Sequence, residues 1–234
     1  MYAVPHALAS SDEARHEMLA LLGSAQRIDM TWCGGETLRL SSDWVVDIYH
    51  TPGHSAGHLS VFDPRSRTMF SGDAVQGARY LDINGAPALC PTYQHVDAYL
   101  TTIRAFDALP IDRLASCHWP LHVGPAVKDF LEESHQFVDS VLLDELRNCP
   151  DGATLAELLV AAGPRLGGWP RSVDRELVYA VEGHLDRLVA RGTIVSHLGI
   201  TPRRYILSSI DSEAEHHELH APAQSAAWCD LHRL

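Results

Sequence analysis

The order of apolar and polar residues predicts short strands in the first third of the chain, after an initial helix. Residues 9–23 (ASSDEARHEMLALLG) have the pattern of a helix that a serine can cap and Gly23 can end. Residues 36–50 contain two strand-like runs, ETLRL and WVVDIYH. LSVFD and TMFSG form a second pair, joined by a turn at Pro64–Arg67. These runs predict two successive β-hairpins.

Strands and helices alternate in the next segment. Residues 76–92 have no clear period and contain glycines and prolines, so a loop is predicted there. Residues 95–110 have apolar residues at helical spacing, and RLASC then predicts a short strand. A long helix is predicted from Pro125 to about Arg147, with an apolar side made of Val127, Phe130, Leu131, His135, Val138, Leu142 and Leu146. This order favours an α/β layered sandwich.

The pattern changes near residue 150. TLAELLVAA and RSVDRELVYAVEGHLDRLVARGTI predict two helical stretches, and TIVSH and RRYIL predict a short hairpin around Gly199. Two helices followed by a two-stranded wing resemble a winged-helix module. The tail is rich in Ala, Glu and His without an apolar period, so disorder is predicted for it. The predicted division is therefore 1–149, 150–207 and 208–234.

Composition narrows the classes of protein. Hydrophobic residues make up 46% of the chain and charged residues 21%, which is typical of a globular protein. A net charge of −12 gives no electrostatic support for binding nucleic acid non-specifically. Five scattered cysteines and the absence of a leader-like segment predict reduced thiols and a cytoplasmic location. No stretch approaches the roughly 18 apolar residues that a membrane span requires.

The residues best suited to chemistry lie between His50 and Val75 (HTPGHSAGHLSVFDPRSRTMFSGDAV) and in SCHWPLHVG. His54 and His58 are four residues apart around a Pro-Gly turn, Asp73 follows an apolar run, and His118 follows the strand RLASC. Imidazole and carboxylate groups at strand ends suit a zinc, iron or manganese ion.

Each of these residues also has a plain structural reading. A histidine after Pro-Gly is often a surface turn residue, and an aspartate after a strand is often a turn or helix cap. The interpretation as a site rests on the order in which TPGH, SGD and SCH follow one another. His50 and His122 are taken as satisfied or solvent-facing histidines, and Cys117 is expected to pack in the core.

The segments TPGHSAGH, SGD and SCH resemble the later metal-binding motifs of the metallo-β-lactamase-fold hydrolases, in the branch of glyoxalase II and β-lactamase-like proteins. The resemblance implies that the chain forms part of an αββα sandwich, followed by the winged-helix-like domain. It implies that His54, Asp73 and His118 are metal ligands and that Asp73 is the catalytic carboxylate bridging two metals. His58 would lie behind these ligands and orient them. Zinc is the metal implied first, with iron or manganese as alternatives.

One motif of that family has no counterpart here. The family's HxHxDH motif lies upstream of the TPGH turn, where the only histidines of this chain are His6, His16 and His50. The chain is therefore expected to correspond to the second half of the fold, with an incomplete ligand set, and to be truncated. Missing strands would leave an apolar face open to a second copy or to a complementing chain.

The sequence is compatible with two functions. One is a hydrolase in which a metal-bound hydroxide attacks an ester, thioester or lactone carbonyl of a small molecule. The other is a non-catalytic binding or regulatory protein that recognises a partner or nucleic acid through the winged-helix-like module. The acidic residues of the second helical stretch disfavour contact with phosphates.

Overall fold

The computed structural model describes residues 16, 19–20, 26–141, 146–148, 151–196 and 202–208. Most of the helix predicted over residues 9–23 lies outside these ranges, although His16, Leu19 and Ala20 are helical. The tail beyond residue 208 also lies outside them, so its predicted disorder stays a prediction.

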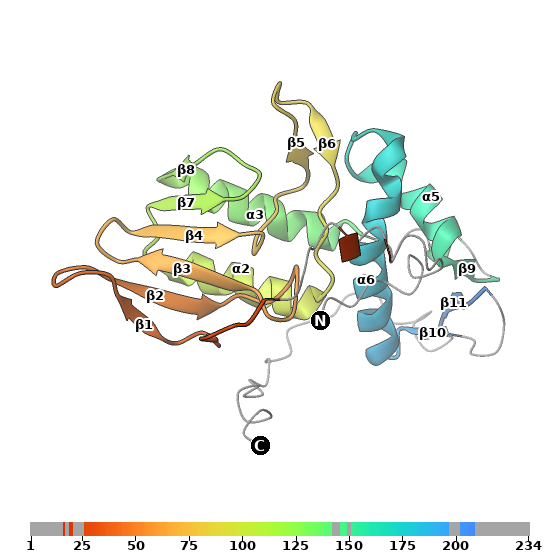
Figure 1. Cartoon of the computed structure of the whole chain (residues 1–234). Coiled ribbons are helices and arrows are strands. Elements are labelled where there is room, and N and C mark those ends of the chain that lie inside the picture. The colour runs from red at the N-terminus through yellow and green to blue at the C-terminus, as the bar shows by residue number, and fades with distance from the viewer. Residues whose placement is uncertain are drawn as a thin grey trace, which may run out of the picture.

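A six-stranded sheet forms the centre of the fold, with strand order β1-β2-β3-β4-β7-β8 (Figure 1). Its strands are β1 (Thr37–Arg39), β2 (Val45–His50), β3 (Leu59–Asp63), β4 (Thr68–Gly72), β7 (Arg113–Ser116) and β8 (His122–Val123). Both predicted hairpins are confirmed, as is the strand in RLASC. Neighbouring strands are antiparallel except β4 and β7, which run parallel. This parallel pair brings two strand ends to the same edge of the sheet.

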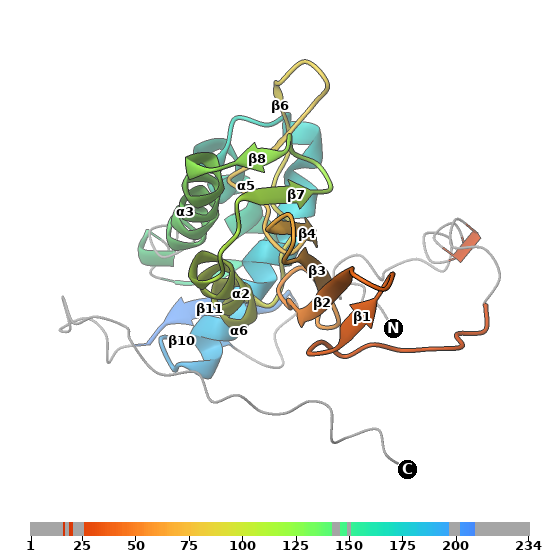
Figure 2. The same ribbon diagram turned by 90° about the vertical axis from the view of Figure 1, so that its left-hand side faces the viewer.

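Two helices cover one face of this sheet, α2 (Val96–Ala108) and α3 (Pro125–Asp139), as Figure 2 shows. Phe62, Met69 and Leu114 occupy paired positions on three adjacent strands and are at most 4% exposed. They belong to the same buried cluster as the inner sides of α2 and α3. On alternate positions of β4 and β8, Phe70 and Val123 are each 52% exposed. The described residues place no helix on that second face.

Two predictions about α3 are wrong in detail, namely where the helix ends and which residues form its buried side. The helix α3 ends at Asp139 instead of continuing to Arg147, and the hydroxyl of Ser140 donates to the Phe137 carbonyl, 2.6 Å away, at its end. The buried side of α3 includes Ser134 and Phe137, whereas the predicted His135 lies towards the surface and pairs with Asp139.

Residues 76–92 are not entirely a loop, because they contain the short hairpin β5 (Tyr80–Leu81) and β6 (Pro87–Leu89). The carboxylate of Asp82 accepts hydrogen bonds from the backbone N–H groups of Asn84 and Ala86, and Gly85 adopts a positive φ. This turn chemistry explains why a segment without periodicity forms a hairpin.

The second unit contains β9 (Ala153–Thr154), α5 (Leu155–Leu166), a 3₁₀ segment η1 (Arg171–Leu177), α6 (Val178–Ala190), β10 (Ile194–Ser196) and β11 (Arg204–Leu207). The two predicted helical stretches and the two strands are present, and β9 adds a third strand in the order β10-β11-β9. A capping box between Thr154 and Glu157 starts α5. Among the described helices, none is both long and apolar enough to cross a membrane.

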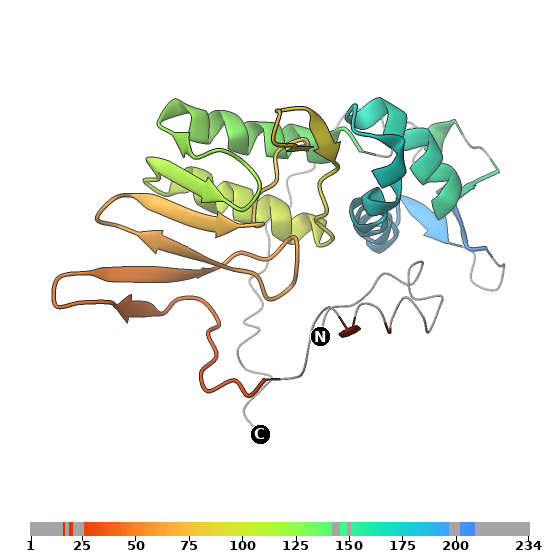
Figure 3. The same ribbon diagram turned by 45° about the horizontal axis from the view of Figure 1, so that its top comes forward.

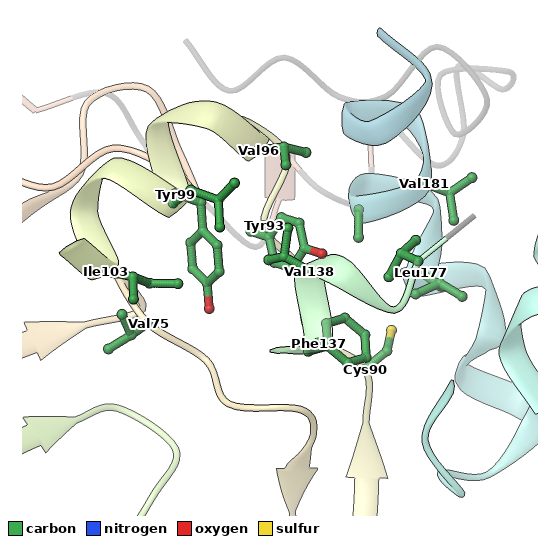
Figure 4. Packing of buried hydrophobic residues seen from close by; sticks show 14 of the residues in the cluster. Val75, Cys90, Tyr93, Val96, Tyr99, Ile103, Phe137, Val138, Leu177 and Val181 are labelled. Atoms are coloured by element: carbon green, nitrogen blue, oxygen red, sulfur yellow. The ribbon is translucent and has the colours of Figure 1, made fainter. Parts of the chain in front are cut away.

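The second unit shares its core with the sheet and helices of the first. Figure 3 shows α6 beyond the ends of α2 and α3, and one continuous cluster of buried side chains runs through both units. At the junction, Tyr93, Phe137 and Val138 lie near Leu177 and Val181 (Figure 4). The predicted boundary near residue 150 therefore does not separate two independent cores.

Candidate metal site

The parallel pairing of β4 with β7 creates the meeting point of two predicted ligands. Asp73 follows the end of β4, and His118 lies two residues beyond β7. Nε2 of His118 is 3.4 Å from Oδ1 of Asp73. The sequence therefore identified two residues, 45 positions apart, that the fold brings into contact.

Oδ1 of Asp73 is buried and makes no hydrogen bond in the described part of the chain, although Nε2 of His118 lies 3.4 Å away. A buried carboxylate oxygen without a partner is costly unless a cation or a donor compensates it. This orphaned oxygen, beside an imidazole, fits a metal ion chemically.

Gly72 makes room for a third side chain at this edge. The β4–β7 register shifts between Phe70 and Gly72, and Gly72 has a φ of +55°. A Cβ atom at Gly72 would lie 3.0 Å from Nε2 of His58, so a larger residue would push this histidine away. Nε2 of His58 instead accepts a hydrogen bond from the backbone N–H of Asp73 at 3.2 Å.

Nδ1, the other ring nitrogen of His58, begins a chain of hydrogen bonds between polar side chains. Its Nδ1 lies 2.9 Å from Oγ1 of Thr51, which lies 2.8 Å from Oγ of Ser60. The Ser60 hydroxyl donates in turn to the Ser71 carbonyl at 3.2 Å. Burial, assisted by the charge of His54, lowers the pKa of His58, so the neutral ring is favoured. With Nε2 accepting, Nδ1–H donates to Thr51, and the backbone at Asp73 is fixed.

His54 lies on the turn after β2, where Gly53 packs closely against Tyr99. The Gly53 carbonyl accepts the backbone N–H groups of Gln94 and His95, which ties this turn to the start of α2. Nδ1 of His54 is 3.1 Å from Nε2 of Gln76.

Nδ1 of His54 also lies 3.3 Å from Oγ1 of Thr92. Sequence reasoning missed both Gln76 and Thr92, since single polar residues in an irregular segment carry no periodic signal.

The three predicted ligands do not form a closed set. The structure joins Asp73 to His118, whereas the contacts of the His54 ring are with Gln76 and Thr92. Within the described ranges, no group of three or more His, Cys, Asp or Glu side chains is arranged to hold a metal ion. The structure thus shows contact between two of the three predicted ligands, and the full ligand set stays a prediction.

The remaining candidates lie outside this group. Nε2 of His50 contacts the Ala56 carbonyl at 2.8 Å, and the His122 ring stacks on Phe130 at 4.2 Å between centroids. Cys117 is exposed, so the prediction that it packs in the core is wrong. It directly follows β7 at the sheet edge, where the chain turns outward.

Aromatic side chains border the Asp73–His118 pair. The ring of Tyr80 lies 4.9 Å from His118 and 4.5 Å from Trp119, centroid to centroid. The indole N–H of Trp119 donates to the Arg79 carbonyl at 3.1 Å. The hairpin of β5 and β6 thus supplies one wall beside the candidate ligands.

Part of the chain matches a known protein family, and its fold is similar to solved structures. Residues 4–118 match the family model described as metallo-beta-lactamase superfamily. The fold is similar to a metallo-beta-lactamase family protein from Thermus thermophilus, with a TM-score of 0.55 and 19% identity over 78% of this chain and 55% of that chain. It is also similar to a beta-lactamase domain protein from Burkholderia ambifaria, with a TM-score of 0.63 and 16% identity over 86% of this chain and 61% of that chain. At these identities the likeness shows the fold, and the chain spans less than two thirds of either structure. No curated protein matches the sequence.

Proposed function

We propose that this chain is a metal-dependent hydrolase of the metallo-beta-lactamase superfamily, whose family model residues 4–118 match. The substrate class is a small molecule with an ester, thioester or lactone carbonyl. The observation that carries the proposal is the buried, unpartnered Oδ1 of Asp73 beside Nε2 of His118. A carboxylate and an imidazole in this relation are suited to a divalent metal ion.

In this proposal Asp73 and His118 hold the metal, with His54 as the third ligand. Zinc suits this donor set, and iron or manganese accept the same donors. A bound metal ion supplies Lewis-acid activation of the carbonyl and of water. His58 keeps the backbone of Asp73 in place through the hydrogen bond from the Asp73 N–H.

Tyr80 and Trp119 have a separate role in this proposal. Their packed rings form an apolar wall against which the acyl part of a substrate can lie. We assign the segment 150–207 a structural part, as a winged-helix-like unit that packs onto the core through α6.

The test is the metal content of the purified chain, measured by mass spectrometry for the unaltered protein and for Asp73→Asn. The proposal expects about one or two metal ions per chain, lost on substitution. Asp107→Asn serves as the matched control, because Asp107 is an exposed aspartate on α2. Retention of metal in Asp73→Asn would place the metal elsewhere.

Hydrolysis is tested separately with a panel of ester, thioester and lactone compounds. The proposal expects turnover by the metal-loaded protein and its loss in Asp73→Asn and His118→Ala. Metal binding without turnover of any of the three classes would contradict the hydrolase and point to a binding protein.

A further inference from the structure

Gln76 occupies a fully buried position directly beside His54. Its side chain is 0% exposed, and its backbone N–H donates to the Tyr99 hydroxyl at 2.9 Å. A buried side-chain amide with several polar neighbours has a defined orientation, because each neighbour accepts or donates in only one way.

Two contacts fix which end of the amide faces which neighbour. The backbone N–H of Thr92 lies 2.7 Å from Oε1 of Gln76, and this N–H can only donate. The backbone carbonyl of Asp73 lies 3.2 Å from Nε2, and a carbonyl can only accept. Both contacts require the same orientation, so the atom beside His54 is the NH₂ group of the amide.

This orientation decides the protonation of the His54 ring. Nε2 of Gln76 is 3.1 Å from Nδ1 of His54, and an amide NH₂ group only donates. The NH₂ group also faces the Asp73 carbonyl at 3.2 Å and Oγ1 of Thr92 at 3.5 Å. Nδ1 of His54 is the nearest of the three, so one N–H donates to it, and a neutral imidazole then carries its proton on Nε2. A ring nitrogen that carries a proton has no lone pair for a metal ion.

Nδ1 of His54 has a second polar neighbour, the hydroxyl of Thr92, which can accept a hydrogen bond from a protonated Nδ1. Oγ1 of Thr92 is 3.3 Å from the same Nδ1, and it is 3.3 Å from the hydroxyl of Tyr80. In the opposite tautomer, Nδ1–H would donate to Thr92, and Nε2 would be free to coordinate. The Thr92 hydroxyl can also donate to Nδ1, so Thr92 permits either tautomer, whereas Gln76, which makes the shorter contact, can only donate.

We propose that Gln76 is a positioning residue that holds His54 in the Nε2–H tautomer and thereby weakens metal coordination by this ring. Thr92 can donate to Nδ1 or accept from it, so Gln76 is the neighbour that distinguishes the two tautomers. The consequence for metal affinity rests on the proposed function, whereas the tautomer assignment stands without it.

The first measurement is the tautomer of His54 in metal-free protein that contains ¹⁵N-labelled histidine, read from two-bond correlations between ring protons and ring nitrogens. The signal is assigned by its loss in His54→Gln. The expected pattern is that of an Nε2–H ring. An Nδ1–H ring in the unaltered protein overturns the proposal, and this result requires no folded variant at Gln76.

The second measurement compares Gln76→Met with Thr92→Val, in both the tautomer and the affinity for zinc. Gln76→Met removes the donor without adding charge, so His54 is expected to change to Nδ1–H and zinc to bind about 10-fold more tightly. Thr92→Val should keep the Nε2–H ring, because Gln76 still donates to Nδ1. Gln136→Met, the same substitution at an exposed site on α3, should match the unaltered protein.

The outcomes separate the two proposals. An Nε2–H ring that persists in Gln76→Met shows that Gln76 does not set the tautomer. Unchanged or weaker zinc binding in Gln76→Met, despite an altered tautomer, overturns the link to metal affinity. If no variant binds zinc while the tautomers behave as expected, the metal-dependent function fails and the role of Gln76 stands.

Discussion

The hydroxyl of Tyr93 lies 3.0 Å from Nε2 of His184 in the buried interior, although 91 positions separate the two residues in sequence. Tyr93 stacks on Tyr99 of α2, and His184 belongs to α6. Burial lowers the pKa of His184 to about 3, and the nearby Arg187 acts in the same direction. His184 is therefore neutral, and its Nε2 shares a hydrogen bond with the Tyr93 hydroxyl whose direction depends on the tautomer.

The stability of the fold should decrease in mild acid because of His184. Its ordinary pKa of 6.5 applies to the unfolded chain, and the folded value is about 3. Between these values the unfolded chain binds more protons, so the free energy of unfolding falls as the pH falls. The slope is at most about 1.4 kcal/mol per pH unit for this one group.

Chemical denaturation at pH 7.5, 5.5 and 4.5 measures this slope, and His184→Gln keeps an acceptor for Tyr93 without titrating. The variant should lose less stability over the range than the unaltered protein. His58, whose pKa is also lowered, titrates in both proteins, so the difference between them isolates His184. Equal slopes would contradict the assignment.

Tyr93→Phe should destabilise the protein without altering its apolar packing. The substitution leaves Nε2 of His184 buried and without its hydrogen-bond partner, which costs about 1–3 kcal/mol. Denaturant midpoints of Tyr93→Phe and Tyr179→Phe provide the comparison, because Tyr179 is only partly buried. Equal midpoints would show that the Tyr93–His184 hydrogen bond contributes little.

His58→Ala should weaken metal binding by about 10- to 100-fold, because loss of a residue that orients a ligand typically has this effect. The physical cause is release of the Asp73 backbone, whose N–H now donates to His58. Zinc titration measures the effect, and His50→Ala, at an exposed histidine of β2, is the control. Similar affinities in both variants would remove His58 from the site.

Gly183→Ala should separate α6 from the segment that carries Gln94. A Cβ atom at Gly183 would collide with the backbone carbonyl oxygen of Gln94, which cannot move as a side-chain tip can. Overpacking of this kind costs about 1–3 kcal/mol. Thermal unfolding should show a loss for Gly183→Ala and almost none for Gly57→Ala, where a Cβ atom meets nothing within 4 Å.

The spacing of apolar residues and the turn residues between them were sufficient to predict much of the fold. The hairpin of β3 and β4 follows from two alternating runs and the turn residues between them. The end of α3 did not follow, because Leu142 and Leu146 continue its apolar spacing beyond Asp139. Periodicity reports which residues are buried, and a chain can bury them after the helix has ended.

The residues of the candidate site also include some that the sequence predicted and some that it did not. Asp73 and His118 were identified from the order of the TPGH, SGD and SCH segments and from their resemblance to a known family. The structure brings these two residues into contact. Gln76 and Thr92 were missed because their importance comes from contacts with His54, which is 22 and 38 positions away. Such contacts depend on how the chain returns to the sheet, and a single sequence carries no local sign of them.

The parallel pairing of β4 with β7 also affects the order in which the protein can fold. Hairpins such as β2–β3–β4 close over short loops, whereas β7 reaches β4 only after residues 73–112 have crossed the sheet. We therefore expect the Asp73–His118 contact to form after the hairpins, because the β4–β7 pairing closes a longer loop. In a chain that has formed only its hairpins, Asp73 and His118 are both present, but the strand pairing that brings them into contact is missing.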